Sequence, residues 1–149
     1  MAAYNKFEQF VEDLVAGVHD IFGATPTDVL KIYLSNAAPS ASADAVKADL
    51  AEITNENGYT APLDVVNTGT RSGGTVTVQG ESQQITASGG TIGPFQYVAL
   101  YNDTPTAPAD PLVAWWDYGS PLRLQDGESF SVLFNSAAVG VAGDIFTLS

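Results

Sequence analysis

The sequence predicts a mainly β domain, a β-sandwich or β-barrel-like fold, with an N-terminal amphipathic helix and a second short helix, so α+β in content. Residues 95–134 contain three apolar, aromatic runs separated by segments rich in Pro, Gly, Asn and Asp. Such runs, rich in β-branched and aromatic side chains and bounded by turn residues, are typical of strands. A strong helical pattern occurs only over residues 5–22.

The central runs predict strands that are buried on both faces. In residues 95–101 and 112–118, apolar side chains occupy both parities. One parity holds Phe95, Tyr97 and Tyr101 in the first run and Leu112, Ala114, Trp116 and Tyr118 in the second; the other holds Val98 and Leu100, and Val113 and Trp115. Both faces are therefore expected to be covered, by a second sheet, a helix or another subunit.

The N-terminal pattern predicts an amphipathic helix that ends near Gly23, with Pro26 following. Apolar residues recur at i, i+3, i+4 and i+7 and form one wide stripe. The stripe comprises Phe7, Phe10, Val11, Leu14, Val15, Val18, Ile21 and Phe22. It must be buried, either on the chain's own sheet or on a partner. Residues 1–24 are therefore an arm or a packed helix, and residues 25–149 form a single β-rich domain.

The remaining segments follow in order. Residues 29–35 predict a half-buried strand, and Ser42 is positioned to cap a second helix over 43–53. The other expectations are a strand at 63–66, a loop at 69–74, polar edge strands at 75–78 and 84–86, an exposed loop at 102–111, a hairpin joining 122–124 to 130–134, and a closing strand at 144–148.

The charge disfavours two classes of partner. The 149 residues contain 17 acidic and five basic side chains, a net charge of −12. A field of that sign repels nucleic-acid backbones and anionic membrane surfaces. The chain has no cysteine. Residues 1–20 lack the cationic start and apolar run of a signal peptide, and no apolar run is long enough for a membrane span, so synthesis in the cytoplasm is expected.

No catalytic, cofactor-binding or metal-binding residues are predicted, and the chain is not expected to be an enzyme. His19 is the only histidine, which excludes a site with several histidines, and its expected place is the C-terminal end of the first helix. Phosphate-loop, dinucleotide-binding and nucleophile-elbow motifs are missing from the sequence. Asp103 and Asp110 flank a loop and could coordinate Ca²⁺, but without the usual ligand spacing.

The Trp115–Trp116–Asp117 run leaves two interpretations open. Indole rings beside a carboxylate can form a sugar-binding platform, with Asp117 as one carboxylate of a weak hydrolase. Alternatively, Trp116 belongs to the core and Trp115 packs at a sheet surface or an interface.

Several segments, taken together and in order, carry a family resemblance. They are residues 7–14 (FEQFVEDL), 18–20, 30–39 (LKIYLSNAAP), 57–60 (NGYT), 98–104 (VALYNDT), 110–119 (DPLVAWWDYG) and 126–130 (DGESF). The chain resembles small virion proteins of tailed bacteriophages of the capsid decoration, or cement, type. The resemblance implies a non-enzymatic β-rich module that binds the major capsid protein on the outside of an assembled shell and reinforces it. It further implies a homo-oligomer, with a trimer favoured, that is made in the host cytoplasm and resides at the capsid surface.

Two sets of residues are candidate interface anchors under that resemblance. The first is the helix stripe of Phe7, Phe10, Leu14 and Val18, which we favour, and the second is Trp115 with Trp116. Tail and head-fibre proteins share the general appearance of the sequence, so another virion location stays open. The competing hypothesis is a carbohydrate-binding β-sandwich that uses the tryptophan pair.

Overall fold

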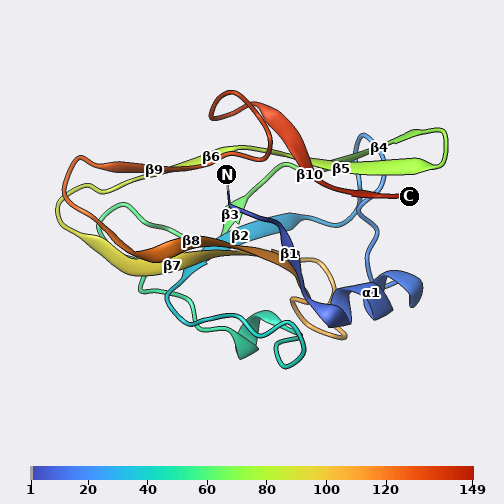
Figure 1. Ribbon diagram of the computed structural model, residues 1–149, viewed down its shortest axis with the longest axis horizontal. Helices are drawn as coiled ribbons and strands as arrows, with labels where there is room; N and C mark the ends of the chain where they lie inside the picture. The colour runs from blue at the N-terminus through green and yellow to red at the C-terminus, as the bar shows by residue number, and fades with distance from the viewer. Residues whose placement is uncertain (1) are drawn as a thin grey trace.

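The computed structural model describes residues 2–149 and shows a mainly β chain in facing layers of antiparallel strands (Figure 1). One layer is a five-stranded sheet in the order β1-β8-β7-β2-β3. Its strands are β1 (Asn5–Lys6), β2 (Leu30–Ser35), β3 (Leu63–Asp64), β7 (Ile92–Asn102) and β8 (Leu112–Leu124). The facing layer holds a three-stranded sheet, β10-β5-β4, and the pair β6-β9. These strands are β4 (Thr68–Ser72), β5 (Thr75–Glu81), β6 (Gln83–Thr86), β9 (Ser129–Val132) and β10 (Ala142–Leu148).

The facing layer is built around one long, briefly interrupted strand. Only Ser82 separates β5 from β6. β9 pairs with β6 and β10 pairs with β5, both antiparallel, with Ser129 opposite Thr86 and Ala142 opposite Glu81. β9 and β10 therefore follow the same direction along β6 and β5, and residues 133–141 form a loop that leaves the layer between them (Figure 1).

The centre of the five-stranded sheet is buried on both faces, which confirms the expectation in part, because β8 is exposed from Asp117 to Pro121. Its inner face meets the facing layer in a large core that includes Leu30, Ile32, Leu34, Val98 and Leu100. Its outer face carries a second cluster of Phe7, Tyr33, Leu50, Ala99, Tyr101 and Leu112. The long connection from β2 to β3, which supplies Leu50, covers this outer face (Figure 1).

A bulge in β8 changes which side chains share a face. Leu100 on β7 lies opposite Ala114, but the next residue, Tyr101, lies opposite Leu112. Val113 is therefore an extra residue on β8. One extra residue on a strand moves the side chains beyond it to the other face.

Because of this irregular pairing, part of the predicted assignment of side chains to the two faces of the sheet is wrong. Leu112 packs in the outer cluster with Trp115, whereas Trp116 packs against the inner core. Phe95, predicted to share a face with Tyr101, lies in the inner core, because the register between β7 and β8 also shifts beside it.

The first helix, α1, spans Glu8–Val15 and is shorter than the predicted range of 5–22. The predicted wide apolar stripe is not confirmed either. Val11 and Val15 are exposed, whereas Asp13 is buried. The helix lies on the chain's own β domain at the β1 end of the sheet (Figure 1).

A Schellman ending explains why α1 stops early. Gly17 adopts a left-handed φ of +77°. Its amide donates to the Leu14 carbonyl at 3.2 Å, and the Val18 amide donates to the Asp13 carbonyl at 2.9 Å. These are the two hydrogen bonds that satisfy the last carbonyls of a helix in this motif. The stop is therefore at Gly17, and the predicted stop at Gly23 is wrong.

The second helix predicted over 43–53 is also wrong, since this segment forms only a 3₁₀ turn, Lys47–Asp49. Backbone groups of this segment form hydrogen bonds with residues outside it. The Ala45 carbonyl accepts from the Leu112 amide at 2.9 Å, and the amide that opens the turn donates to the Asp110 carbonyl at 2.9 Å. These contacts with the β7–β8 connection take the place of helical hydrogen bonds.

The predicted loop at 69–74 is largely strand β4 and its turn into β5. Gly69 and Gly23 exchange two backbone hydrogen bonds, of 2.7 and 3.1 Å. A Cβ atom at Gly69 would come within 2.9 Å of the Phe22 backbone. The glycine is therefore needed for a close approach of two backbones, and it does not mark a loop.

Replacing Gly17 with alanine should lower the free energy of unfolding by about 1–2 kcal/mol, because an L side chain is strained at this φ. A Cβ atom there would meet no other atom within 4 Å, so the cost is conformational. Urea denaturation measures it. Gly74→Ala is the matched control, since Gly74 is equally uncrowded but lacks a left-handed φ. Equal stability of the two variants would contradict the Schellman assignment.

Candidate functional site

An apolar groove of about 430 Å³ opens between the layers on the side formed by β8 and β9. Trp116 and Tyr118 line it from β8, and Phe130 and Val132 line it from β9. The other lining residues are Ala2, Tyr4, Val98, Ser131, Leu133, Phe134, Asn135, Ser136, Asp144 and Ile145. Alternation along β8 points Trp116 and Tyr118 to the same side, into the groove.

Aromatic rings in mutual contact shape the groove. The Trp116 ring lies 5.9 Å from that of Tyr4 and 5.6 Å from that of Phe134. Phe130 makes edge-to-face contacts with Phe95 at 5.0 Å and with Tyr118 at 5.9 Å. Rings held in this way move little and present large apolar surfaces, which favours contact with an apolar partner.

The loop 133–141 is held above the groove by Ser82. The Ser82 hydroxyl accepts from the Phe134 amide at 3.1 Å and bonds the Ser136 hydroxyl at 2.8 Å. The Ser82 amide donates to the Val141 carbonyl at 3.1 Å, and the Ser82 carbonyl accepts from the Gly140 amide at 2.8 Å. One buried serine therefore anchors both ends of the loop where the long strand is interrupted.

The first four residues of this loop, 133–136, line the groove. The loop contains no charged residue and exposes Leu133, Val139 and Val141. Sequence reasoning did not single it out, although its lack of charge was a signal. Exposed aliphatic side chains beside an aromatic groove are typical of a protein-binding surface.

The charged groups near the groove are acidic. Asp144 lines it and accepts a hydrogen bond from Gln79 at 2.8 Å. Asp117 does not line the groove, since it alternates with Trp116 and Tyr118 on β8; it is exposed and accepts from the Gly119 amide at 2.7 Å. The groove is therefore better suited to contact with an apolar partner that carries cationic side chains than to the transfer of a proton.

The first predicted set of anchors is mostly committed to the chain's own core. Phe7 and Phe10 are 0% and 1% exposed. Leu14 and Val18 are half-buried, and Leu14 packs against the inner core. In this conformation the two phenylalanines offer no surface to a partner.

The two tryptophans point to different faces of the five-stranded sheet. Trp115 stacks on Phe7 with ring centroids 4.6 Å apart, beside the outer cluster. Trp116 lies in the groove. The structure therefore does not bring the pair together as one platform, and the aromatic partners of Trp116 are Tyr4 and Phe134.

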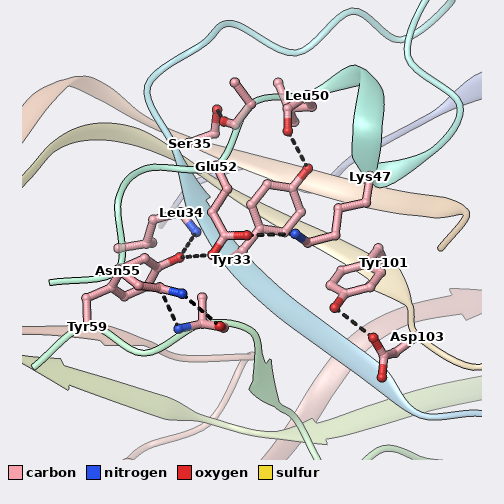
Figure 2. A network of polar contacts seen from close by, with 12 residues as sticks. Tyr33, Leu34, Ser35, Lys47, Leu50, Glu52, Asn55, Tyr59, Tyr101 and Asp103 are labelled. Carbon is pink, nitrogen blue, oxygen red and sulfur yellow. Dashed lines mark hydrogen bonds and ion pairs between the residues drawn. The ribbon is translucent and has the colours of Figure 1, made fainter.

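The outer face of the sheet carries a polar network beneath the β2–β3 connection (Figure 2). The Lys47 ammonium lies 4.8 Å from the Tyr33 ring centroid and pairs with Glu52 at 2.6 Å. The Tyr33 hydroxyl donates to the Leu50 carbonyl at 3.1 Å, and the Tyr59 hydroxyl accepts from the Leu34 amide at 2.8 Å.

These buried hydroxyls have a structural role. Burial raises the pKa of Tyr33 and of Tyr59, so both stay neutral. An unpartnered buried hydroxyl would cost about 1–3 kcal/mol, and each here has a partner. The network therefore fixes the covering connection onto the sheet.

Asp103 belongs to the same face. Its carboxylate pairs with Lys31 at 2.5 Å and accepts from the Tyr101 hydroxyl at 2.9 Å. Burial raises the pKa of Asp103, but the bonds from Lys31 and Tyr101 outweigh it and lower the pKa overall. Among residues 2–149, no group of three or more acidic or histidine side chains is arranged to hold a metal ion, and Asp110 does not join Asp103 in one.

His19 lies beyond the end of α1, so its predicted position within the helix is wrong. The Asn102 side-chain nitrogen donates to Asp28 at 2.6 Å and faces His19 Nδ1 at 2.9 Å, while its oxygen accepts from the Thr104 amide. His19 Nδ1 is therefore an acceptor. Burial lowers the pKa of His19, although Asp13 and Asp28 act in the opposite direction.

Comparison of the chain with protein-family models, curated proteins and solved structures finds no match. Within the part of the chain that the structure describes, no helix is both long and apolar enough to cross a membrane.

Replacing Ser82 with alanine should lower the free energy of unfolding by about 1–3 kcal/mol, because the buried Phe134 amide loses its acceptor. Hydrogen exchange should also accelerate within 133–141. Ser129→Ala is the control, since its hydroxyl pairs with Thr86 at an exposed site. An unchanged exchange rate in the loop of Ser82→Ala would show that the serine is not its anchor.

Acidification should destabilise the protein through His19. The unfolded chain binds a proton at the ordinary pKa of 6.5, and the folded chain only at lower pH, so stability falls as the pH drops below about 6.5. His19→Gln should reduce the loss in unfolding free energy between about pH 7 and pH 5. Urea titrations at both values measure this loss. An equal loss in the variant and the wild type would contradict the burial of a neutral imidazole.

Proposed function

We propose that this chain is a non-enzymatic structural protein of a bacteriophage particle that binds the outer surface of the capsid. The observation that carries the proposal is the aromatic groove continued by the uncharged loop 133–141. Together they form an apolar surface with an acidic rim, a name we give to Asp144 in the groove and to Asp126 and Glu128 at the turn before β9, on a chain of net charge −12. A surface of this kind suits stoichiometric binding to another protein.

The arrangement of the layers supports the same proposal. We class the fold as a β-sandwich, with its five-stranded sheet covered on both faces. A domain with a closed core and one apolar side can bridge neighbouring capsid subunits without rearranging. The partner would be the major capsid protein, and the protein itself would act as a homo-oligomer, with a trimer favoured.

The docking surface in this proposal differs from the favoured helix stripe. Trp116 remains a proposed interface anchor, and Tyr118, Phe130 and the exposed Leu133 are added to it. Phe7 packs in the outer cluster and Phe10 in the inner core, so removing the N-terminal residues 2–22 would disrupt the fold as well as any contact.

The carbohydrate-binding alternative is favoured by one observation, the aromatic lining of the groove. Aromatic faces stack on sugar rings, and Ser131, Asn135 and Asp144 offer polar groups beside them. In that case Trp116→Phe should weaken binding to a glycan panel, whereas Trp115→Phe should not, because Trp115 packs on Phe7 outside the groove. The lack of any glycan response in wild-type fluorescence would count against this alternative.

Size-exclusion chromatography with light scattering tests the leading proposal. The protein is mixed with phage heads that lack it, and co-elution at a fixed stoichiometry is the expected result. Tyr118→Ala should weaken the affinity for heads at least about tenfold, as expected for an interface aromatic residue, and so lower the amount that co-elutes. Phe22→Ala should not, and it is a matched control because Phe22 and Tyr118 are 53% and 55% exposed. Failure of the wild-type protein to co-elute with heads would refute the proposal.

A further inference from the structure

β9 is an unprotected strand edge beside the groove. β9 pairs with β6 on one side, and among residues 2–149 no strand pairs with its other side. Its sequence, Ser-Phe-Ser-Val, contains no proline, charge or glycine. Natural edge strands are often protected by proline, by charged side chains or by being very short, because an open edge recruits another strand. β9 is short, at four residues, but has neither of the first two protections.

The opposite wall of the groove is protected. β8 pairs with β1 only at Ala114 and Trp115. Farther along, Gly119 has a φ of +99° and Pro121 lacks an amide hydrogen, so this stretch of edge cannot form a regular ladder. An added strand is therefore directed to β9, where its inward side chains would meet Trp116 and Tyr118.

The charges indicate which kind of strand fits. Asp144 lines the groove, and Asp126 and Glu128 stand at the turn that leads into β9. Of the five basic side chains in the sequence, Lys31 and Lys47 are engaged in ion pairs. A second copy of this chain would bring another net charge of −12 to the surface, which opposes self-association there.

We propose that β9 accepts an extended segment of a basic protein partner by strand addition, with alternate apolar side chains in the aromatic groove and lysine or arginine at the acidic rim. Backbone hydrogen bonds to the β9 edge would supply part of the affinity, and the groove would select the side chains. This inference rests on the proposed function and adds the recognition mode to it: an arm of the shell protein would be the segment bound.

Synthetic peptides test the strand directly. The probe is a capped peptide of about seven residues in which valine alternates with lysine, a length typical of a strand. Two further peptides are N-methylated, one at the valines and one at the lysines. Successive amides of a strand point to opposite edges, so only one of the two methylated peptides should lose affinity, by at least about tenfold. Tryptophan fluorescence and calorimetry measure binding.

Protein variants and a charge-reversed peptide complete the design. Tyr118→Ala should weaken binding of the valine–lysine peptide, Tyr118→Phe should restore it, and Phe22→Ala should leave it unchanged. A valine–glutamate peptide should not bind. Equal affinity for all N-methylated and unmodified peptides, equal loss with both methylated forms, or binding of the glutamate peptide would each overturn the inference.

The head-binding experiment separates this result from the proposed function. If heads bind the protein through Tyr118 but the peptides fail these criteria, the capsid role stands and strand addition is refuted. If the peptides behave as expected but heads do not bind, the groove is a strand acceptor and the capsid role is refuted. A dimer that forms through the β9 edge, seen as a doubled mass that Tyr118→Ala abolishes, would replace the basic partner with a second copy.

Discussion

The pairing of β7 with β8 is the constraint on which the rest of the structure depends. These strands carry apolar or aromatic side chains on both faces, so each face must be covered for the sheet to be stable in water. The facing layer covers one side. The β2–β3 connection covers the other, and the hydroxyls of Tyr33 and Tyr59, with the Lys47–Glu52 pair, fix it there. The chain thus covers this outer sheet face with a long, irregular connection, whereas many β domains leave such a face exposed to solvent.

The groove follows from how the layers end. β1 is too short to cover β8 beyond Trp115, and the loop 133–141 interrupts the strand that would otherwise close the facing layer. Aromatic rings at this open side remain partly exposed, and Ser82 holds the loop beside them. An exposed apolar surface is a risk for aggregation, which the high negative charge of the chain counteracts. A partner of the kind proposed would bury this apolar surface and so remove the risk of aggregation.

The sequence predicted most strands, and burial on both faces for the central part of β7 and the start of β8, because period-two patterns and turn residues are local. It failed where contacts distant in sequence decide the structure. The Val113 bulge moves Leu112 away from Trp116, and parity alone cannot reveal an extra residue. The helix over 43–53 gives way to bonds with the β7–β8 connection. The glycine that ends α1, Gly17, lies inside the apolar pattern that predicted a longer helix, so the pattern obscured the stop. The candidate site was predicted only through Trp116, since Tyr4, Phe130 and the loop 133–141 meet it through pairing across layers.

The most direct test of this account is hydrogen–deuterium exchange of the protein alone and bound to phage heads. Protection on binding should be concentrated in β9 and the loop 133–141, with a smaller effect at residues 116–118 of β8. The β2–β3 connection, which covers the outer face, should exchange equally in both states. Protection confined to that connection or to α1, with β9 unchanged, would contradict the assignment of the groove as the binding surface.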